Sequence, residues 1–293
     1  MANTIDLHTH STASDGLYAP AEVVRLAREA GLARIGLVDH DTTGGLDEAL
    51  EAGDKLGVTV VPGIEINTDL PHKRGEAHVL GYYIEYESPD FQRALTILRE
   101  ARVRRGERIV ERLREQGLDI TWERVREIAR GSVGRPHIAR ALIEKGYATD
   151  VSNAFDTWLS PGRPGYIPRY KLAPEDAVRL IKSVRGVPVL AHPAYIPDLE
   201  AQILPSLVMA GLQGLECYYG EYDDATVARL LRLADIYGLV PTGGSDYHGP
   251  NMHPTPLGGR HVPQSSAERL ERTGAFNHKL PAEAFTLPEP KNS

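Results

Sequence analysis

Short runs of apolar, β-branched residues alternate along the chain with stretches in which apolar residues recur at helical spacing. The apolar runs predict seven buried strands, near Ile5–Leu7, Arg34–Val38, Val58–Ile64, His78–Ile84, Val187–Ala191, Gly214–Tyr218 and Leu239–Thr242. Amphipathic stretches between them predict helices at Pro20–Ala30, Leu46–Leu56, Pro174–Val184 and Asp223–Tyr237. Near-continuous apolar strands that alternate with helices favour a parallel α/β barrel over an open sheet.

The alternation of strands and helices stops between about Pro89 and Arg169. The pattern there is helical throughout, at Phe91–Gln116, Glu123–Ala129, Pro136–Lys145 and Val151–Leu159. We therefore predict a barrel domain from residues 1–90 and 170–293 and an all-helical insertion over 91–169 that covers the substrate. The tail after Val262 has weak periodicity, so we expect it to pack along the outside of the barrel or to be partly mobile.

Charge is divided unevenly along the chain, whose net charge is −7. Arg99–Lys145 contains 13 lysine and arginine residues against eight aspartate and glutamate residues, so it carries +5 and leaves −12 for the rest. This asymmetry predicts a cationic site bounded by carboxylates and faced by a basic cover that attracts anions. The negative total argues against a general nucleic-acid coat protein and against a binder of anionic membranes.

Composition is that of an ordinary globular enzyme, with 293 residues and 41% hydrophobic content. The single cysteine, Cys217, excludes an internal disulfide framework and fits a reducing compartment, and we expect it to be a small buried hydrophobe. No signal peptide and no membrane-spanning run is visible. We expect a cytoplasmic protein with no membrane association and no obligate protein partner.

Six of the 11 histidines fall at the ends of predicted strands or directly after them: His8, His10, His40, His78, His192 and His248. Carboxylates occupy the same kind of position: Asp15, Asp39, Asp41, Glu65 and Asp246. The carboxyl ends of parallel barrel strands meet at one face, and side chains two apart on a strand share a side. One such histidine alone is more often a surface or hydrogen-bonded residue than a ligand. Together, without a cation, these groups would be poorly paired.

The set of candidate ligands comprises the six histidines with Glu65, Asp15 and Asp246. Nine donors are too many for a single ion with open positions, so we predict a cluster of two or three divalent ions. Imidazole and carboxylate donors without thiolate suit Mn, Fe or Zn. Two such ions that share a water lower its pKa and supply a hydroxide nucleophile.

Six segments carry these residues in the order DLHTHSTASDG, GLVDHD, PGIEI, EAHVLGY, LAHP and GSDYH. In this order they resemble the motifs of the PHP (polymerase and histidinol phosphatase) family, over residues 5–90 and 187–250. The resemblance implies a distorted (β/α)7 barrel with a trinuclear metal centre used for phosphoester hydrolysis.

The same resemblance implies three ligand sets. The first metal has His8, His10, Glu65 and Asp246, and the second has Asp15, His40 and His248. The third has His78 and His192, with Glu65 as a bridging ligand. Many family members have histidine where this chain has Asp15. Because aspartate is a harder, anionic ligand, we expect it to shift metal preference toward Mn or Fe over Zn, with Mn foremost.

The segments SVGRPHIARALIEKGY and SNAFDTWLSPGRPGYIPRY resemble small bacterial members that act as 3′,5′-nucleotide bisphosphate phosphatases. Relatives of these include the 5′→3′ exoribonuclease RNase AM. The resemblance implies a small anionic nucleotide as substrate, with short RNA as the alternative. Asp246, His248 and His192 are the candidates for protonating the leaving oxygen, and the sequence does not choose among them.

Arg135 and His137 begin a predicted helix, where backbone N–H groups and a guanidinium suit a second phosphate. Arg169 and Lys171 lie on the return loop as further substrate contacts, although a solvated surface role suits Arg169 equally well. Tyr18, like Tyr166 and Tyr170, could stack on a base or simply pack. Asp39 could orient His40 from behind, or form a turn.

Two classes of function compete. The first is a phosphoesterase that releases the 3′-phosphate of a 3′,5′-bisphosphonucleotide such as adenosine 3′,5′-bisphosphate (pAp), with a 5′→3′ exoribonuclease on short 5′-phosphorylated RNA as runner-up. The second is a non-catalytic metal-binding or interaction module, against which the full ligand set argues. A third hypothesis, hydrolysis of C–N bonds on a similar barrel, has less support, because no lysine lies at the end of a predicted strand where it could bridge two metals.

Overall fold

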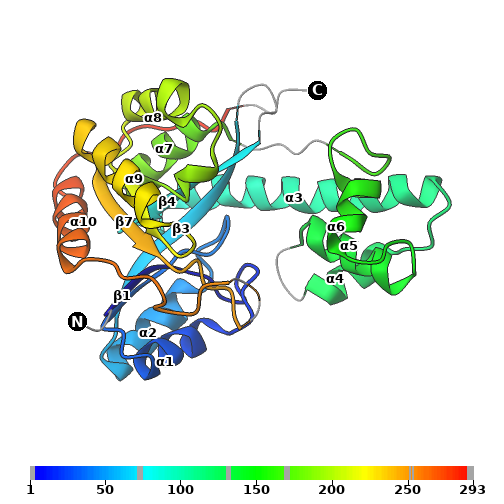
Figure 1. The fold of residues 1–293 in the computed structure, drawn as a ribbon, viewed down its shortest axis with the longest axis horizontal. Helices are drawn as coiled ribbons and strands as arrows, with labels where there is room; N and C mark the ends of the chain where they lie inside the picture. Colours follow the sequence, from blue (N-terminus) through cyan, green and yellow to red (C-terminus); the bar gives the residue numbers. More distant parts are fainter. Residues whose placement is uncertain are drawn as a thin grey trace. The chain divides into compact units, whose positions relative to one another are not determined.

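The computed structural model describes residues 4–70, 75–129, 133–167, 172–250, 252 and 254–288. The chain divides into two compact units, Met1–Ala94 with Lys171–Glu289 and Leu95–Tyr170 with Pro290–Ser293. The first unit contains all the strands and the second contains helices (Figure 1). The role of the second unit as a substrate cover stays a prediction.

Seven strands form one sheet in sequence order: β1 (Ile5–Thr9), β2 (Arg34–Leu37), β3 (Thr59–Asp69), β4 (Glu76–Tyr82), β5 (Val187–Leu190), β6 (Gly214–Tyr219) and β7 (Val240–Gly244). The sheet nearly closes on itself, because Thr9 bridges Tyr247 and the N–H of His10 donates to the Tyr247 carbonyl at 2.9 Å. This confirms the predicted α/β barrel of seven strands.

Strand β4 runs antiparallel to both of its neighbours, whereas the other pairs of strands are parallel. The prediction of a wholly parallel barrel is therefore wrong at this strand. Strand β3 continues well past the predicted end at Ile64, so the connection to β4 is too short for a parallel crossover. As a result, the start of β4 lies at the end of the barrel where the parallel strands finish.

Helices surround the strands of the first unit (Figure 1) and are α1 (Pro20–Glu29), α2 (Leu46–Leu56), α7 (Pro174–Ser183), α8 (Leu204–Ala210), α9 (Asp224–Ile236) and α10 (Gln264–Asn277), with the short turns η3 (Pro193–Tyr195) and η4 (Leu199–Ile203). Proline opens α1 and α7, where its missing N–H costs no hydrogen bond. Gly57 ends α2 in the left-handed conformation, with φ 68°. The helices α1, α2 and α7 start at the residues that the sequence predicted, and α9 starts one residue later, whereas α8 was not predicted.

The segment after Val262 folds into α10, a helix that the weak periodicity did not predict. Ala267 and Leu270 are buried in the same apolar cluster as the strand residues Ile5 and Val240. The expectation that this tail packs along the barrel is right, and a regular helix does the packing.

Closure of the barrel depends on a buried carboxylate in β1. Asp6 accepts hydrogen bonds from the N–H and Oγ of Ser245, at 2.9 and 2.6 Å, and from the N–H of Gly258 at 2.8 Å. Gly244 approaches β1 so closely that a Cβ there would lie 2.5 Å from the backbone nitrogen of His8. These contacts bring the residues that follow β7 next to the histidines of β1.

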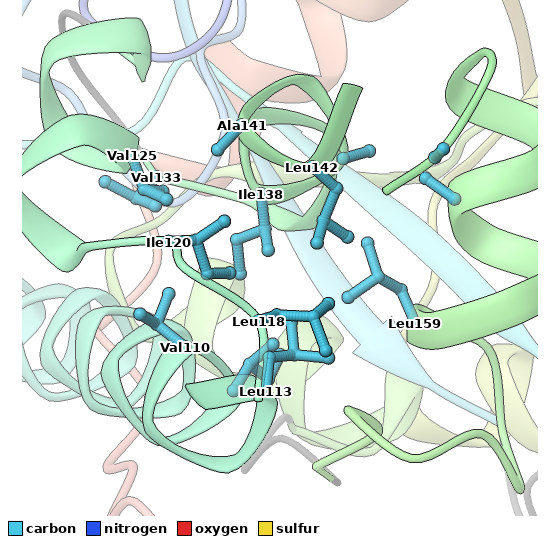
Figure 2. Close-up of a cluster of buried hydrophobic side chains, with 14 of the residues drawn as sticks. Val110, Leu113, Leu118, Ile120, Val125, Val133, Ile138, Ala141, Leu142 and Leu159 are labelled. Carbon is cyan, nitrogen blue, oxygen red and sulfur yellow. The ribbon is translucent and has the colours of Figure 1, made fainter. Parts of the chain in front are cut away.

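The second unit is built from α3 (Pro89–Glu115), in which the boundary between the units falls, and from α4 (Trp122–Ala129), α5 (Arg135–Glu144), α6 (Val151–Ala154) and η2 (Phe155–Leu159). Its centre is aliphatic, as Figure 2 shows for Val110, Leu113, Leu118, Ile120, Val125, Val133, Ile138, Ala141, Leu142 and Leu159. The helices of the described residues are too short or too polar to cross a membrane.

Candidate metal centre

All nine side chains that the sequence singled out as ligands gather at one end of the barrel, here called the mouth. Six imidazoles form one continuous cluster of rings: His8, His10, His40, His78, His192 and His248. The closest pair, His10 and His248, has ring centroids 4.1 Å apart, and His78 and His192 are 5.0 Å apart. The carboxylates of Asp15, Glu65 and Asp246 lie among these rings.

His8 and His10 face the mouth because side chains alternate along β1. Thr9 between them points the other way, and its hydroxyl donates to the carbonyl of Gly36 at 2.8 Å. Both histidines are buried, with 0% and 1% of their surface exposed. The sequence expectation that this pair shares one centre agrees with the structure.

His78 reaches the mouth by a route that the sequence reading did not foresee. It lies near the start of β4, opposite Asn67 of β3. Since β4 is antiparallel, its start is at the mouth, and the His78 Nδ1 lies 2.9 Å from Glu65 Oε1. The predicted placement is right, but the reason given for it, the end of a parallel strand, is wrong.

Glu65 occupies the centre of the cluster and is 1% exposed. Five imidazoles have a ring nitrogen within 3.4 Å of its two oxygens, namely His8, His10 and His40 beside Oε2 and His78 and His192 beside Oε1. A carboxylate with each oxygen among different imidazoles has the geometry of a bridging ligand.

Three groups of side chains bring their donor atoms within 4.8 Å of one another, close enough to hold a divalent cation: His8, His10, Glu65 and Asp246; His10, Asp15, His40 and His248; and His40, Glu65 and His78. The first group equals the first predicted ligand set. The second adds His10 to the predicted residues. The third has His40 in place of His192, whose Nε2 lies 3.3 Å from Glu65 Oε1.

His10 provides a test of whether these residues fit metal ions. Neither of its ring nitrogens makes a hydrogen bond of normal geometry, although the ring is buried. Its Nε2 lies 3.2 Å from an oxygen of Glu65 and 3.2 Å from an oxygen of Asp246. A buried imidazole without hydrogen bonds is costly unless a cation satisfies it. The nitrogen and oxygen donors of the mouth therefore fit a site for several metal ions.

The carboxylates and imidazoles of the mouth shift one another's pKa values. Burial opposes a charge on His10, but Asp246 and Glu65 outweigh it and raise its pKa to about 10. Burial lowers the pKa of His40 to about 3, against the attraction of Glu65 and Asp15. Burial also opposes ionisation of Glu65, yet the imidazoles around it, His40 foremost, hold its pKa well below the usual range. Metal binding must displace the proton on His10, because a ligating imidazole is neutral.

Glu216 is a candidate positioning residue that the sequence did not indicate. It is fully buried in β6, where its Oε1 lies 2.9 Å from His8 Nδ1 and its Oε2 accepts the N–H of His192 at 2.7 Å. It thereby fixes the ring of His8 so that Nε2 faces the mouth. The signal was an acidic residue inside an apolar strand. Its neighbour Cys217 is buried as expected, and burial raises the pKa of that thiol.

The carboxylate of Asp39 shapes the loop after β1. It accepts hydrogen bonds from the N–H of Ser11 at 2.8 Å, the Oγ of Ser11 at 2.7 Å and the Oγ of Ser14 at 2.6 Å. The side chains beside His40 Nδ1 are Glu65, with Oε2 at 3.1 Å, and Asn67, with Nδ2 at 3.2 Å. Of the two roles considered for Asp39, these contacts favour the loop over the orientation of His40.

Three residues of the mouth adopt strained backbone conformations. Asp41, His192 and Asp246 have φ of 54°, 28° and 57°, and each directly follows or closely follows a strand. A non-glycine residue in this region costs of order 1–3 kcal/mol, and such strain clusters at functional sites. At Asp246 the turn leaves Oδ1 3.2 Å from the Nε2 atoms of His8 and His10, while Oδ2 accepts the hydroxyl of Tyr219 at 3.0 Å.

The predicted phosphate contacts Arg135 and His137 belong to the second unit. The guanidinium of Arg135 lies 5.3 Å from the centre of the Phe155 ring and is 3.5 Å from the carbonyl of Leu159. The Nδ1 of His137 accepts the N–H of Gly134 at 3.0 Å, which caps the start of α5. Both side chains thus have structural partners, and their contact with substrate stays a prediction.

Of the remaining predicted substrate contacts, some lie within the described residues and others lie outside them. Tyr18 lies half-buried on the loop between β1 and α1, and its carbonyl accepts the N–H of Thr12 at 2.8 Å. Arg169, Lys171 and the candidate stacking residue Tyr170 lie outside the described residues. In the second unit, the guanidinium of Arg105 covers Tyr166 at 5.8 Å, so that ring has a packing partner.

Residues 6–168 match the family model of the PHP domain. This match spans more than half of the 293 residues, so the chain belongs to the PHP domain family. The resemblance seen in the sequence is confirmed. With the donor clusters of its barrel mouth, the protein is a metal-dependent phosphoesterase of this family.

Known relatives extend the match over most of the chain. A 3′,5′-nucleoside bisphosphate phosphatase of Chromobacterium violaceum is 33% identical over 89% of this chain and 91% of its own length. A phosphoribosyl 1,2-cyclic phosphate 1,2-diphosphodiesterase of Eggerthella lenta is 36% identical over 83% and 94%. The 5′-3′ exoribonuclease Rnm of Salmonella typhimurium is 33% identical over 84% and 85%. A solved structure of a Bifidobacterium adolescentis protein that is assigned as a metal-dependent phosphoesterase has a TM-score of 0.81 and 33% identity, covering 94% of this chain and 97% of its own.

Proposed function

We propose that the protein hydrolyses the 3′-phosphate of 3′,5′-bisphosphonucleotides such as pAp with the help of two or three divalent metal ions, Mn²⁺ foremost. The observation that carries this proposal is the sharing of His10, His40 and Glu65 among three donor groups. Ligands shared in this way fit ions that lie side by side, as a multinuclear phosphoesterase requires. The phosphatase of Chromobacterium violaceum supports the choice of substrate.

The nine side chains of the mouth would hold the ions: His8, His10, Asp15, His40, Glu65, His78, His192, Asp246 and His248. Bound divalent ions supply a water of lowered pKa and offset negative charge on the phosphoryl group. Glu65 would serve more than one ion, because its two oxygens lie among different imidazoles, and Glu216 holds His8 in the orientation that a ligand needs. Tyr219 occupies one oxygen of Asp246, which leaves the other oxygen to face the mouth.

Protonation of the leaving oxygen would fall to His192 or His248, in place of the ligand role that the nine-residue set otherwise gives that histidine. Their side chains are 18% and 16% exposed, so both reach the solvent side of the cluster. Asp246 suits this task less well, because His8 and His10 overcome the effect of burial and hold its pKa well below the usual range. An ionised carboxylate has no proton to give, and Asp246 therefore serves as a ligand.

The second phosphate of the substrate is assigned to Arg135 and His137, with Arg169 and Lys171 on the return loop. The excess of positive charge in Arg99–Lys145 supports this assignment, since it attracts doubly charged nucleotides. Tyr18 remains a candidate for contact with the base. Arg135 offers a planar fork that matches phosphate oxygens.

A 5′→3′ exoribonuclease is the second candidate, favoured by the same basic segment and by the relative in Salmonella typhimurium. The two activities are separated by assaying pAp, a 5′-phosphorylated oligoribonucleotide and a 1,2-cyclic phosphate of phosphoribose under one set of Mn²⁺ conditions. We expect pAp to have the highest kcat/KM. Equal or faster turnover of the oligonucleotide, with a steep loss of affinity in salt, would assign the exoribonuclease activity instead. No hydrolysis of any substrate by the Mn²⁺-loaded protein would favour the non-catalytic module.

A further inference from the structure

Three tyrosines of the first unit extend outward from the candidate metal centre. Tyr219 donates its hydroxyl to Asp246 Oδ2, and its ring centroid lies 5.6 Å from that of His192. Tyr222 follows at 5.1 Å from Tyr219. Tyr195, in the short turn η3 just after His192, lies 6.1 Å from Tyr219 and 5.7 Å from Tyr222. The three rings form a continuous aromatic shelf that begins at two of the proposed metal ligands.

The shelf is buried at its inner end and open at its outer end. Tyr219 and Tyr222 are 4% and 6% exposed, whereas Tyr195 is 60% exposed. The hydroxyl of Tyr195 lies 3.1 Å from Glu221 Oε2, and the hydroxyl of Tyr222 accepts the N–H of Ala194 at 2.9 Å. Two buried rings and these polar contacts hold Tyr195 in place, so an open aromatic ring is presented beside the mouth rather than folded into the core.

We propose that this shelf binds the nucleobase of the substrate, with Tyr195 as the residue that stacks on it. The proposal rests on the proposed function, because a phosphate at the metal centre is what places a nucleotide here. Two ring-to-ring steps put Tyr195 within about 12 Å of the His192 ring, within the span of one nucleotide. Every base has an aromatic face, so stacking on a tyrosine requires a base without selecting which one.

The kinetic test compares pAp with ribose 3,5-bisphosphate, which has both phosphates and lacks the base. The parent protein should show a lower KM for pAp than for the base-free compound. Tyr195→Ala should raise the KM for pAp about tenfold, in line with the usual effect of removing a stacking aromatic, and leave the base-free substrate unchanged. Equal effects on both substrates, or none on either, would overturn the proposal.

Two further variants separate stacking from other roles of this tyrosine. Tyr195→Phe keeps the ring and removes the contact with Glu221, so its KM for pAp should stay within about threefold of the parent. A loss as large as that of Tyr195→Ala would contradict stacking. Phe276→Ala is the matched control, because Phe276 is 59% exposed and lies near Val240 at the start of β7, the opposite end from the mouth. It should leave both substrates unaffected.

A binding measurement tests whether the aromatic shelf binds a base independently of whether the protein hydrolyses pAp. Saturation-transfer NMR with adenosine 5′-monophosphate should show transfer from the protein to the adenine protons, and Tyr195→Ala should abolish it while metal content and thermal unfolding stay as in the parent. If saturation transfer is absent in the parent, or is equal in Tyr195→Ala, the proposal that the shelf binds the base is rejected. A parent protein that shows transfer but does not hydrolyse pAp would support the shelf and reject the proposed activity.

Discussion

The barrel mouth and the centre of the helical unit are two buried clusters built from opposite kinds of side chain. The mouth packs six imidazoles against three carboxylates, has strained backbone at Asp41, His192 and Asp246, and leaves the nitrogens of His10 without hydrogen bonds. The helical unit buries aliphatic side chains such as Leu113 and Ile138 with conventional packing (Figure 2). The mouth buries polar and strained groups, which are uncommon in a stable core, whereas the helical unit buries the apolar groups that are typical of one.

This difference indicates that the residues of the helical unit serve stability and that those of the mouth serve binding and catalysis. Burial of apolar side chains in a core stabilises the fold, so their replacement is expected to reduce stability. Buried polar groups that lack partners oppose folding, so their presence indicates a task that needs a cation or a substrate. We therefore expect substitutions in the mouth to remove activity with the fold intact, and substitutions in the helical unit to lower stability first.

The largest effect is expected from His10, which belongs to two of the three donor groups. His10→Ala should lower kcat/KM for pAp by about 1,000-fold or more, because loss of a shared ligand disturbs two ions at once. Asp246→Asn should act in the same way. Circular dichroism of the metal-free variants should match that of the parent, so that the loss of activity is not a loss of fold.

The exposed histidine His261 provides the matched control, and His261→Ala should keep full turnover. Substantial activity of His10→Ala at saturating Mn²⁺ would count against the placement of the metal centre. Global unfolding of His10→Ala would count against the contrast between the two clusters.

In the helical unit, Leu113→Ala should lower the free energy of unfolding by about 2–5 kcal/mol, because it removes a fully buried side chain and leaves a cavity. Its metal content should equal that of the parent. Urea unfolding followed by circular dichroism measures the first quantity, and mass spectrometry of the bound metals the second. Ile97→Ala on the same helix is the control, since Ile97 is 44% exposed. Loss of metal from a folded Leu113→Ala protein would remove the distinction between the clusters.

Metal affinity should rise with pH because the carboxylates of the mouth raise the pKa of His10 to about 10. At pH 7 the metal-free protein holds this proton, and Mn²⁺ must displace it, so affinity should increase about tenfold per pH unit for each proton released. The raised pKa also stabilises the metal-free fold below about pH 6.5, and this contribution disappears as the pH rises toward 10.

Calorimetric titration of Mn²⁺ in buffers of different ionisation heat counts the protons released at pH 7. His10→Gln should release one proton fewer than the parent. A titration of the parent with no proton release at this pH would contradict a charged His10.

The smallest effect is expected from Arg135, the residue of the helical unit that is proposed to bind the second phosphate. Arg135→Ala should raise the KM for pAp about tenfold and change kcat little, because it removes a charged hydrogen-bond donor to the second phosphate. Steady-state assays of phosphate release measure this. Arg140→Ala, an exposed arginine on the same helix, should leave KM unchanged. Equal KM values in all three proteins would exclude Arg135 from substrate binding.

Much of the barrel was predictable because its signals are local. The strands have continuous apolar runs, and α1 and α7 begin at prolines that the sequence displays. The direction of β4 was missed although the segment between Ile64 and His78 has no helical period, which a parallel crossover would need. Helix α10 was missed because its order depends on contacts with strands far away in the sequence.

The candidate ligands were predictable from histidines and carboxylates at strand ends, with the family motifs behind them. Their supporting residues were not, because Glu216, Asn67 and Tyr219 acquire their roles only through tertiary contacts. Glu216 lies 208 positions from His8 along the chain. No spacing rule links two such residues before the barrel has closed.

Metal content is the most direct test of the central claim that the polar mouth is a multinuclear phosphoesterase site. The protein should be stripped with a chelator, reloaded with Mn²⁺, analysed by inductively coupled plasma mass spectrometry, and assayed for phosphate release from pAp in the same preparation. We predict two to three ions per chain, with phosphate release that appears only on reloading. A fully folded chain that holds no more than one ion, or that releases phosphate equally well without metal, would contradict the account.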